Sequence, residues 1–194
     1  YVPQAFGAIA DDVYVTGFTA FNIDFFDMTD TFTPITFVVV LGLSFVLLTV
    51  VFRSIVVPIK AIIMNLLSVG AAYGLMVLVF HKGYGADLLG FQKSEIIDAW
   101  IPLFLFSVLF GLSMDYHVFL LSRIRERYDQ TKQNAEAVAY GLRATAGLIT
   151  GAALIMVAVF SGFAMGVTVS NQQVGFGLAV AVLIDATLVR TVLV

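Results

Sequence analysis

The 194-residue sequence contains no cysteine, which excludes a framework of disulfide bonds and a thiolate metal site. Charge is also scarce: Asp, Glu, Lys and Arg make up 12% of the chain, whereas soluble domains contain about 25%. Hydrophobic residues make up 60% of the chain, and its mean hydropathy is +1.00. A chain with so little charge and so much apolar surface is typical of a membrane protein.

Apolar runs divide most of the chain into five segments, each long enough to cross about 30 Å of hydrocarbon as a helix. Pro58 falls in the first turn of the second segment, where its missing N–H has no cost. The predicted fold is therefore an all-α polytopic membrane protein. We expect its transmembrane helices near residues 33–52, 55–80, 100–122, 145–165 and 174–194.

Basic residues set the expected orientation. Lys82 and Lys93 fall on one side of the five spans, and the other eight basic residues fall on the opposite side. By the positive-inside rule the larger group is cytoplasmic, which places the N-terminus of this chain outside the cell. The larger group consists of Arg53, Lys60, Arg123, Arg125, Arg127, Lys132, Arg143 and Arg190.

Residues 1–32 are less apolar than the rest of the chain. The stretch "DDVYVTGFTA" has a short strand-like alternation that ends at Gly17, and "FNIDFFDMTDTF" resembles a helix leading into the first span. Because one strand cannot fold alone, we expect this strand to be the end of an external domain. The sequence is therefore expected to be part of a longer protein.

The cytoplasmic segment 123–143 divides into a continuation of the third span and a short helix that Asn134 caps. Its five basic residues are spread over 21 positions. That spacing favours a solvated flank over a patch that binds nucleic acid or lipid headgroups. We therefore expect no nucleic-acid partner.

One carboxylate interrupts the third span. Asp115 lies about 12 Å along the helix from Arg123, at about 1.5 Å per residue, and is thus inside the hydrocarbon. An ionised side chain at mid-bilayer costs about 2.5–3.5 kcal/mol, so such residues are functional by default. Two readings stay open: a group that couples protons or ions, and a structural carboxylate bonded inside a bundle. Small polar residues share its face: Ser107, Gly111 and Ser122.

Other polar and small residues lie within the spans. Asp185 has Ala181 and Gly177 one and two turns before it, and either a functional or a structural role explains it. His117 lies about 200° round the helix from Asp115, so the two should not pair. Tyr116 can reach a neighbouring helix. In the second span we single out one polar residue and a pair of small residues that permits close helix packing: Asn65, Gly70 and Gly74.

Two long stretches resemble the MMPL family, the mycobacterial-type large membrane proteins within the RND exporter superfamily. They are "GLSMDYHVFLLSRIRERY" and "GFGLAVAVLIDATLVRTVLV", and "VYVTGFTA" is similar to the end of the family's second external domain. The resemblance implies a protein of two similar halves, each with one helix, a large external domain and five further helices. Residues 1–32 would end the second extracytoplasmic α/β porter domain, and residues 33–194 would be the last five helices.

The resemblance also implies a function. The family uses an Asp-Tyr pair in its tenth helix as half of a proton relay, and Asp115 and Tyr116 match that pair. The partner pair would lie in an N-terminal half that this sequence does not include. We thus expect an exporter in the cell membrane that is driven by the proton-motive force and moves lipids or other hydrophobic molecules. It would not be an enzyme and would need no cofactor or metal. The alternatives are a sterol-sensing or accessory module without transport and an intramembrane aspartyl protease.

Overall fold

The computed structural model describes residues 17–94 and 96–187. The chain separates into two compact units, Tyr1–Phe37 and Val38–Val194. What is described of the first unit is helical and belongs to α2 (Phe18–Phe52), which continues into the second unit. The strand predicted before Gly17 lies outside the described residues. The predicted lead-in helix and first span form one helix, which includes Pro34.

Threonine side chains of α2 bond within the helix itself. The hydroxyl of Thr29 donates to the carbonyl oxygen of Phe25 at 2.8 Å, and that of Thr33 donates to Thr29 at 2.6 Å. A hydroxyl bonded in this way has no need of water, which is what an apolar environment requires. These bonds therefore satisfy the two hydroxyls within α2 itself.

The second unit contains every other described element. These are α3 (Val56–Met76), the π-helical turn η2 (Val77–His81), α4 (Ala86–Leu89), α5 (Trp100–Thr131), α6 (Asn134–Ala164) and α7 (Val169–Ile184). No described residue is in a strand. Four segments are long and apolar enough to cross a membrane: Phe18–Phe52, Val56–His81, Trp100–Thr131 and Asn134–Ala164. The predicted all-α multi-pass membrane fold is confirmed.

The fifth predicted span, 174–194, corresponds to α7 and the turn after it. Helix α7 has 16 residues and begins at Val169, five residues before the predicted start. Helical turns of the π type continue to Thr187, and the rest of the predicted span, with Arg190, lies outside the described residues.

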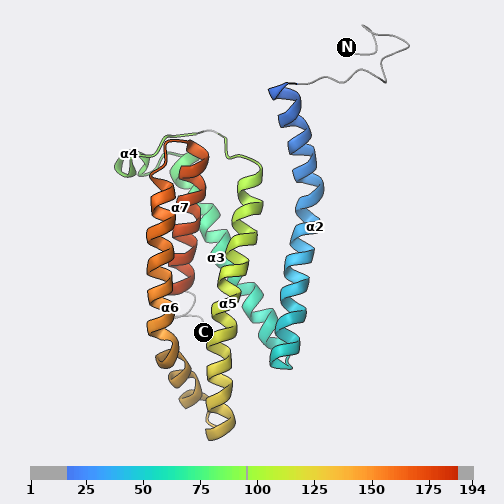
Figure 1. Cartoon of the computed structure of the whole chain (residues 1–194), viewed down its shortest axis with the longest axis vertical. Helices are drawn as coiled ribbons and strands as arrows, with labels where there is room; N and C mark the ends of the chain where they lie inside the picture. The colour runs from blue at the N-terminus through green and yellow to red at the C-terminus, as the bar shows by residue number, and fades with distance from the viewer. Residues whose placement is uncertain (1–16, 95, 188–194) are drawn as a thin grey trace, which may run out of the picture. The chain divides into compact units, whose positions relative to one another are not determined.

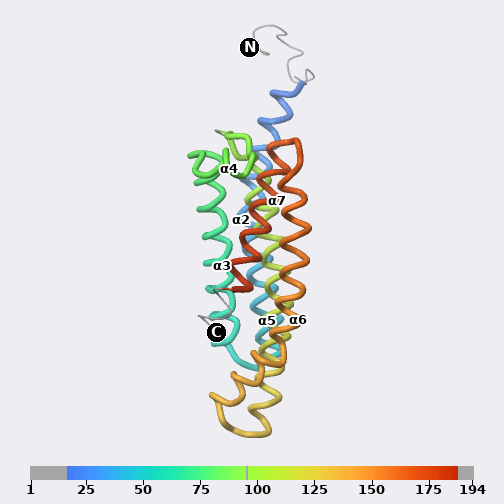
Figure 2. Tube along the Cα trace, turned by 90° about the vertical axis from the view of Figure 1, so that its left-hand side faces the viewer, coloured from blue at the N-terminus to red at the C-terminus, as the bar shows by residue number. Residues whose placement is uncertain are grey.

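Helices α3, α5, α6 and α7 lie side by side in both views (Figures 1 and 2). Helix α6 packs along α5 and α7, and α3 also packs against α5 and α7. The most deeply buried side chains are large and apolar, and they include Phe80, Phe106, Phe110 and Leu105. A smaller cluster joins the end of α2 to α3 and α5 through Leu48, Phe52 and Ala61. The core of this unit is therefore a helix–helix core without a sheet.

The segment predicted to be cytoplasmic folds as a helical hairpin, because α5 and α6 both continue beyond their predicted spans (Figure 2). Lys132 makes the turn with a left-handed backbone, at φ 55°. The predicted cap at Asn134 was wrong: Gln133 occupies the cap position and forms no side-chain cap bond. Asn134 is instead the first helical residue, because the turn at Lys132 brings the chain into α6 one residue earlier.

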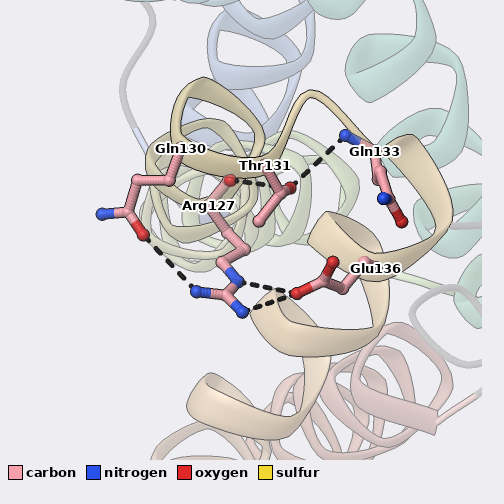
Figure 3. A network of polar contacts seen from close by, with 5 residues as sticks. All are labelled: Arg127, Gln130, Thr131, Gln133 and Glu136. Atoms are coloured by element: carbon pink, nitrogen blue, oxygen red, sulfur yellow. Dashed lines mark hydrogen bonds and ion pairs between the residues drawn. The ribbon is translucent and has the colours of Figure 1, made fainter.

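Arg127 holds the two arms of this hairpin together (Figure 3). Its guanidinium donates to Glu136 from Nε at 3.1 Å and from Nη2 at 2.5 Å, and it lies over the ring of Tyr140 at 5.2 Å. Thr131 accepts from the backbone N–H of Gln133 at 3.4 Å. Each charged partner is more than a third exposed, so this pair contributes up to about 1 kcal/mol. The pair joins α5 to α6 beside the turn.

At the other end of the bundle, the segment before α5 is bonded to the start of α7. Gln172 accepts from the backbone N–H of Gln92 at 3.1 Å, and Gln173 donates to the carbonyl oxygen of Ile96 at 3.2 Å. Ser170 donates to Asp98 at 2.5 Å. Both glutamines are buried, so these bonds satisfy polar groups that would otherwise be costly. The α3–α5 connection is thus tied to α7.

Two glycines permit the closest approaches between helices. A Cβ added to Gly175 of α7 would lie 2.2 Å from the backbone nitrogen of Ala164 in α6. A Cβ added to Gly141 of α6 would lie 2.4 Å from Cγ1 of Ile124 in α5. The first contact is with backbone, which cannot rotate away. Gly175 therefore sets the distance between α6 and α7.

We predict that Gly175→Ala destabilises the protein by about 1–3 kcal/mol, the usual cost of overpacking. The added methyl group can be accommodated only if α6 and α7 separate. The measurement is the melting temperature of the purified protein. Gly151→Ala is the matched control, because a Cβ there meets nothing within 4 Å in the described chain. Equal melting temperatures for the two variants would contradict the close contact.

Candidate functional site

A small cavity with polar residues in a largely apolar wall lies between α3, α5 and the end of α7, and we call it the polar cavity. Its volume is about 20 Å³, enough for about one water molecule. Each of the three helices supplies at least one polar side chain to it, and apolar residues such as Val69, Leu109 and Val182 complete the wall. The polar lining consists of Asn65, Ser68, Ser113, Tyr116 and Asp185. Groups predicted separately on three spans thus meet at one place.

Asp185 is the ionisable group of this cavity. It follows the last residue of α7, and only 7% of its surface is exposed. The hydroxyl of Ser68 donates to its Oδ1 at 3.5 Å, a long hydrogen bond. Asn65, one turn before Ser68 on α3, is 2% exposed. A buried carboxyl group with hydroxyl and amide neighbours is suited to hold or pass a proton.

Gly177 and Ala181 lie on the same side of α7 as Asp185. A Cβ added to Gly177 would lie 2.8 Å from Cδ1 of Leu105 and 3.6 Å from the sulfur of Met76. Ala181 is 1% exposed and lines the cavity. These small side chains allow α7 to lie close to α3 and α5, and Asp185 is thereby brought to the polar cavity.

Asp115 is on a different side of α5 and is exposed in the described chain. Gly111, one turn before it, is also exposed, and a Cβ added there meets nothing within 4 Å. Ser107 and Ser122 donate to carbonyl oxygens of their own helix, Leu103 at 2.9 Å and Val118 at 2.7 Å. We call this stripe the Asp115 face: Ser107, Gly111, Asp115 and Ser122.

The Asp115 face points away from the other described helices of the second unit. A carboxylate in a span needs a partner or a proton, and among the described residues no hydrogen bond or ion pair reaches Asp115. No described helix packs on Gly111, so the packing role expected for Gly111 and Ser107 stays a prediction. The same holds for Gly70 and Gly74 of α3, which are exposed with nothing within 4 Å of an added Cβ.

Tyr116 lies beside the polar cavity, although its neighbour Asp115 is exposed. Its hydroxyl donates to the sulfur of Met156 in α6 at 3.3 Å, and its side chain is half-buried. Consecutive residues of a helix are about 100° apart, so an Asp-Tyr pair can face two directions. Asp115 and Tyr116 thus connect the outer face of α5 with the interior of the bundle.

His117 lies on the inner side of α5. It is 4% exposed, and its Nδ1 is 3.1 Å from the carbonyl oxygen of Ser113 and 3.5 Å from the Ser113 hydroxyl. Its ring lines a second cavity together with Lys60, Ala61 and Met64 of α3. Sequence analysis did not single out Ser113. Its spacing of four residues before His117 is the signal that could have identified it.

The geometry defines a class of protein: a multi-pass membrane protein with ionisable side chains on and within its helical bundle. Among the described residues, no three His, Cys, Asp or Glu side chains group to hold a metal ion. The sequence profile of the MMPL family matches residues 9–193 of this chain. The chain belongs to the MMPL family.

Several relatives match nearly the whole chain. This chain is 46% identical over 193 residues to the "Heme uptake protein MmpL11" of Mycobacterium tuberculosis. The aligned region is 100% of this chain and 20% of that protein. The chain is 48% identical over 180 residues to the "Mycolic acid-containing lipids exporter MmpL11" of Mycolicibacterium smegmatis. That alignment covers 93% of this chain and 19% of the relative.

A third relative is the "Trehalose monomycolate exporter MmpL3" of Mycolicibacterium smegmatis, 35% identical over 183 residues, with coverage of 94% and 18%. The chain thus spans about a fifth of the length of the curated relatives that it matches.

We predict that enlarging Gly111 lowers the melting temperature of the full-length protein in proportion to size. Gly111→Ala should have a small effect and Gly111→Leu a large one, because a leucine would push away any helix that packs on the Asp115 face. The measurement is the melting temperature of each variant in detergent. If Gly111→Leu melts at the same temperature as the wild type, the Asp115 face is exposed to lipid and packs against no helix.

Proposed function

We propose that this chain is the C-terminal membrane part of an exporter that is driven by the proton-motive force. The exporter resides in the cell membrane and moves lipids or other hydrophobic molecules outward. The observation that carries the proposal is the placement of Asp115: a carboxylate within a span, on a small-residue face that the described helices leave uncovered. Such a face suits a second set of helices, which the longer protein would provide.

The proposed partner is the N-terminal half of the same protein. Its fourth helix would place a second Asp-Tyr pair against the Asp115 face, as the family resemblance implies. The open space at Gly111 allows a helix backbone to approach closely. Asp115 would then be satisfied by the tyrosine and carboxyl groups of that half, which resolves the cost of an exposed carboxylate in hydrocarbon.

Protonation would change how the two halves pack. A proton that reaches Asp115 from outside removes its charge and weakens the bonds that this charge makes to the opposite half. The helices then shift and drive the external domains. A membrane potential supplies about 2.3 kcal/mol per charge per 100 mV, so a few protons suffice for modest transport work. Asp185 and Asn65 would act as a second intramembrane polar group, linked to the relay through Tyr116.

The proposed orientation follows from the basic residues. The α5–α6 hairpin carries Arg123, Arg125, Arg127 and Lys132, and Arg53 lies at the turn between α2 and α3. With this end in the cytoplasm, the start of α2 and the segment around α4 are extracytoplasmic. The hydrogen bonds between that segment and the start of α7 would then lie below the external domains.

The names of the relatives support hydrophobic cargo for this chain. Two of them are described as exporters of mycolic acid-containing lipids or trehalose monomycolate, and another as a heme uptake protein. An intramembrane aspartyl protease needs two carboxyl groups that share a proton. In the described residues Asp185 lines the polar cavity and Asp115 does not, so the geometry favours transport over that alternative.

We predict that Asp115→Asn abolishes transport by the full-length protein and leaves its abundance and membrane insertion intact. Asparagine preserves the shape of the side chain but cannot take up and release a proton in the same way. The measurement is export of a labelled lipid by cells or vesicles with an imposed pH gradient. Asp87→Asn is the matched control, because Asp87 lies in the exposed α4. Wild-type export by Asp115→Asn would end the proton-relay proposal.

We also predict that residues 1–194 alone do not transport. The Asp115 face has no covering helix among the described residues, so half of the proposed relay is missing. The test reconstitutes this segment in liposomes with an imposed pH gradient and follows export of a lipid analogue, with the full-length protein as the positive control. Gradient-dependent export by the segment would show that the functional unit is smaller than we propose.

A further inference from the structure

We propose that a groove between α6 and α7 binds one acyl chain of a glycerophospholipid from the leaflet at the α4 end of the bundle. The groove has a volume of about 340 Å³ and is lined by α6, α7, the end of α4 and the segment after it. We call it the α6–α7 groove. Volumes of about 300–1,000 Å³ with mainly apolar walls are typical of sites that bind small molecules. This inference goes beyond the proposed function, because it concerns a lipid of the surrounding membrane and neither the relay nor the exported molecule.

The groove follows the axes of two antiparallel helices. Its lining extends along α7 from Phe176 to Leu183 and along α6 from Val157 to Ala164. Each stretch spans seven residues, or about 10 Å at about 1.5 Å per residue. Helix α4 lies at the end of the bundle where α6 ends and α7 begins (Figures 1 and 2). Because α6 is long and apolar enough to cross a membrane, the groove runs broadly along the membrane normal, as acyl chains do.

The walls of the groove are apolar and fixed by aromatic packing. Phe91 and Phe176 both line it, and their rings pack against Phe80 at centroid distances of 5.2 and 5.7 Å. Phe80 is fully buried, so this part of the wall is anchored in the core. Ser161 supplies the one polar side chain of the described lining. A hydrocarbon chain can therefore fill the groove without burying charged or amide groups.

The rim of the groove at the α4 end is apolar as well. Leu89 and Met165 line the groove and are exposed, and so are the nearby Leu88 and Val167. These residues belong to connecting segments, which in contact with water are usually polar. An apolar rim of this kind is suited to the interface of a bilayer. It favours a membrane lipid as the occupant over a soluble partner.

Ser161 provides a hydrogen-bond donor near the mouth of the groove. Hydroxyls elsewhere in the bundle donate to a carbonyl oxygen of their own helix, as Ser107 and Ser122 do. Within the described chain the Ser161 hydroxyl forms no such bond. Ser161 lies four residues before Met165, just after the end of α6, or about 6 Å at about 1.5 Å per residue. Since the ester groups of a glycerophospholipid lie at the edge of the hydrocarbon, an ester carbonyl oxygen can accept from Ser161.

The charges near the mouth of the groove have both signs. Lys82 and Lys93 are exposed in the connection between α3 and α5, and so is Asp87. Recognition of anionic lipids by charge uses clusters of about 4–8 basic residues. We therefore expect the site to recognise the acyl chain and the ester group, and not the charge of the headgroup.

The test is photo-crosslinking of the full-length protein in liposomes of phosphatidylcholine that carries a diazirine at the end of one acyl chain. We expect label on α6 and α7 near Val157 and Leu183. A diazirine close to the ester should label the chain near Met165 instead. Phosphatidylglycerol with the same acyl chains should label the same places to the same extent. A strong preference for either headgroup overturns recognition through the chain and the ester.

Ala179→Phe should remove most of this label, because Ala179 lines the groove and a phenyl ring would fill it. The matched control is Ala158→Phe, since Ala158 is exposed on α6 and does not line the groove. Equal labelling of the two variants overturns the proposal. A wild-type protein that takes no label on α6 and α7 overturns it too, because a helix of the longer protein would then cover the groove.

Ser161→Ala tests the ester contact without filling the groove. A diether phospholipid lacks the carbonyl oxygens, so we expect it to compete for the labelled site about fivefold less well than the diester, the net effect of one hydrogen bond. In Ser161→Ala the two lipids should compete equally. Equal competition in the wild type, or an unchanged preference in Ser161→Ala, overturns the ester contact. Asp115→Asn should leave the label unchanged, so the proton relay and this site can fail separately.

Discussion

A polar group that lies in hydrocarbon must be satisfied by other protein groups, and this constraint organises the bundle. Hydroxyls within the helices donate to carbonyl oxygens one turn earlier, as Ser107, Ser122 and Thr145 do. Longer polar side chains are gathered between α3, α5 and α7, where Asn65, Ser68 and Asp185 meet. Asp115 differs from these groups, because it is exposed in the described chain. The proposed function rests on this difference.

Helix α5 separates the two polar regions because its faces differ. One side carries the Asp115 face, and the other carries Ser113, Tyr116 and His117 toward α3, α6 and α7. Since consecutive helical residues point in different directions, the three residues 115–117 reach the outer face, the polar cavity and the Lys60 cavity in turn. A short stretch of α5 therefore carries side chains in three different surroundings.

Both ends of the bundle restrict how α5 can move. The salt bridge between Arg127 and Glu136 joins α5 to α6 at the hairpin, and Ser170 joins α7 to Asp98 just before α5. Between these ends, Gly175 holds α6 against α7 through a contact with backbone. These contacts join α5, α6 and α7 to one another at both ends and in the middle of the bundle.

The sequence by itself determined the membrane class, the helical fold, the approximate spans and the polar residues that are costly within them. Length, hydropathy and charge are properties of local sequence, so they can be read without knowing what packs on what. The two long stretches around Asp115 and Asp185 likewise indicated the MMPL family, which the match over residues 9–193 confirms. Only the tertiary structure decided that Asp185, Ser68 and Tyr116 share a cavity. It also decided that Ser113 links that cavity to His117, and that Gly175 sets the closest helix contact while Gly70 and Gly74 have open space. Such facts depend on the rotation and separation of whole helices, and small apolar residues at many positions are equally compatible with several packings.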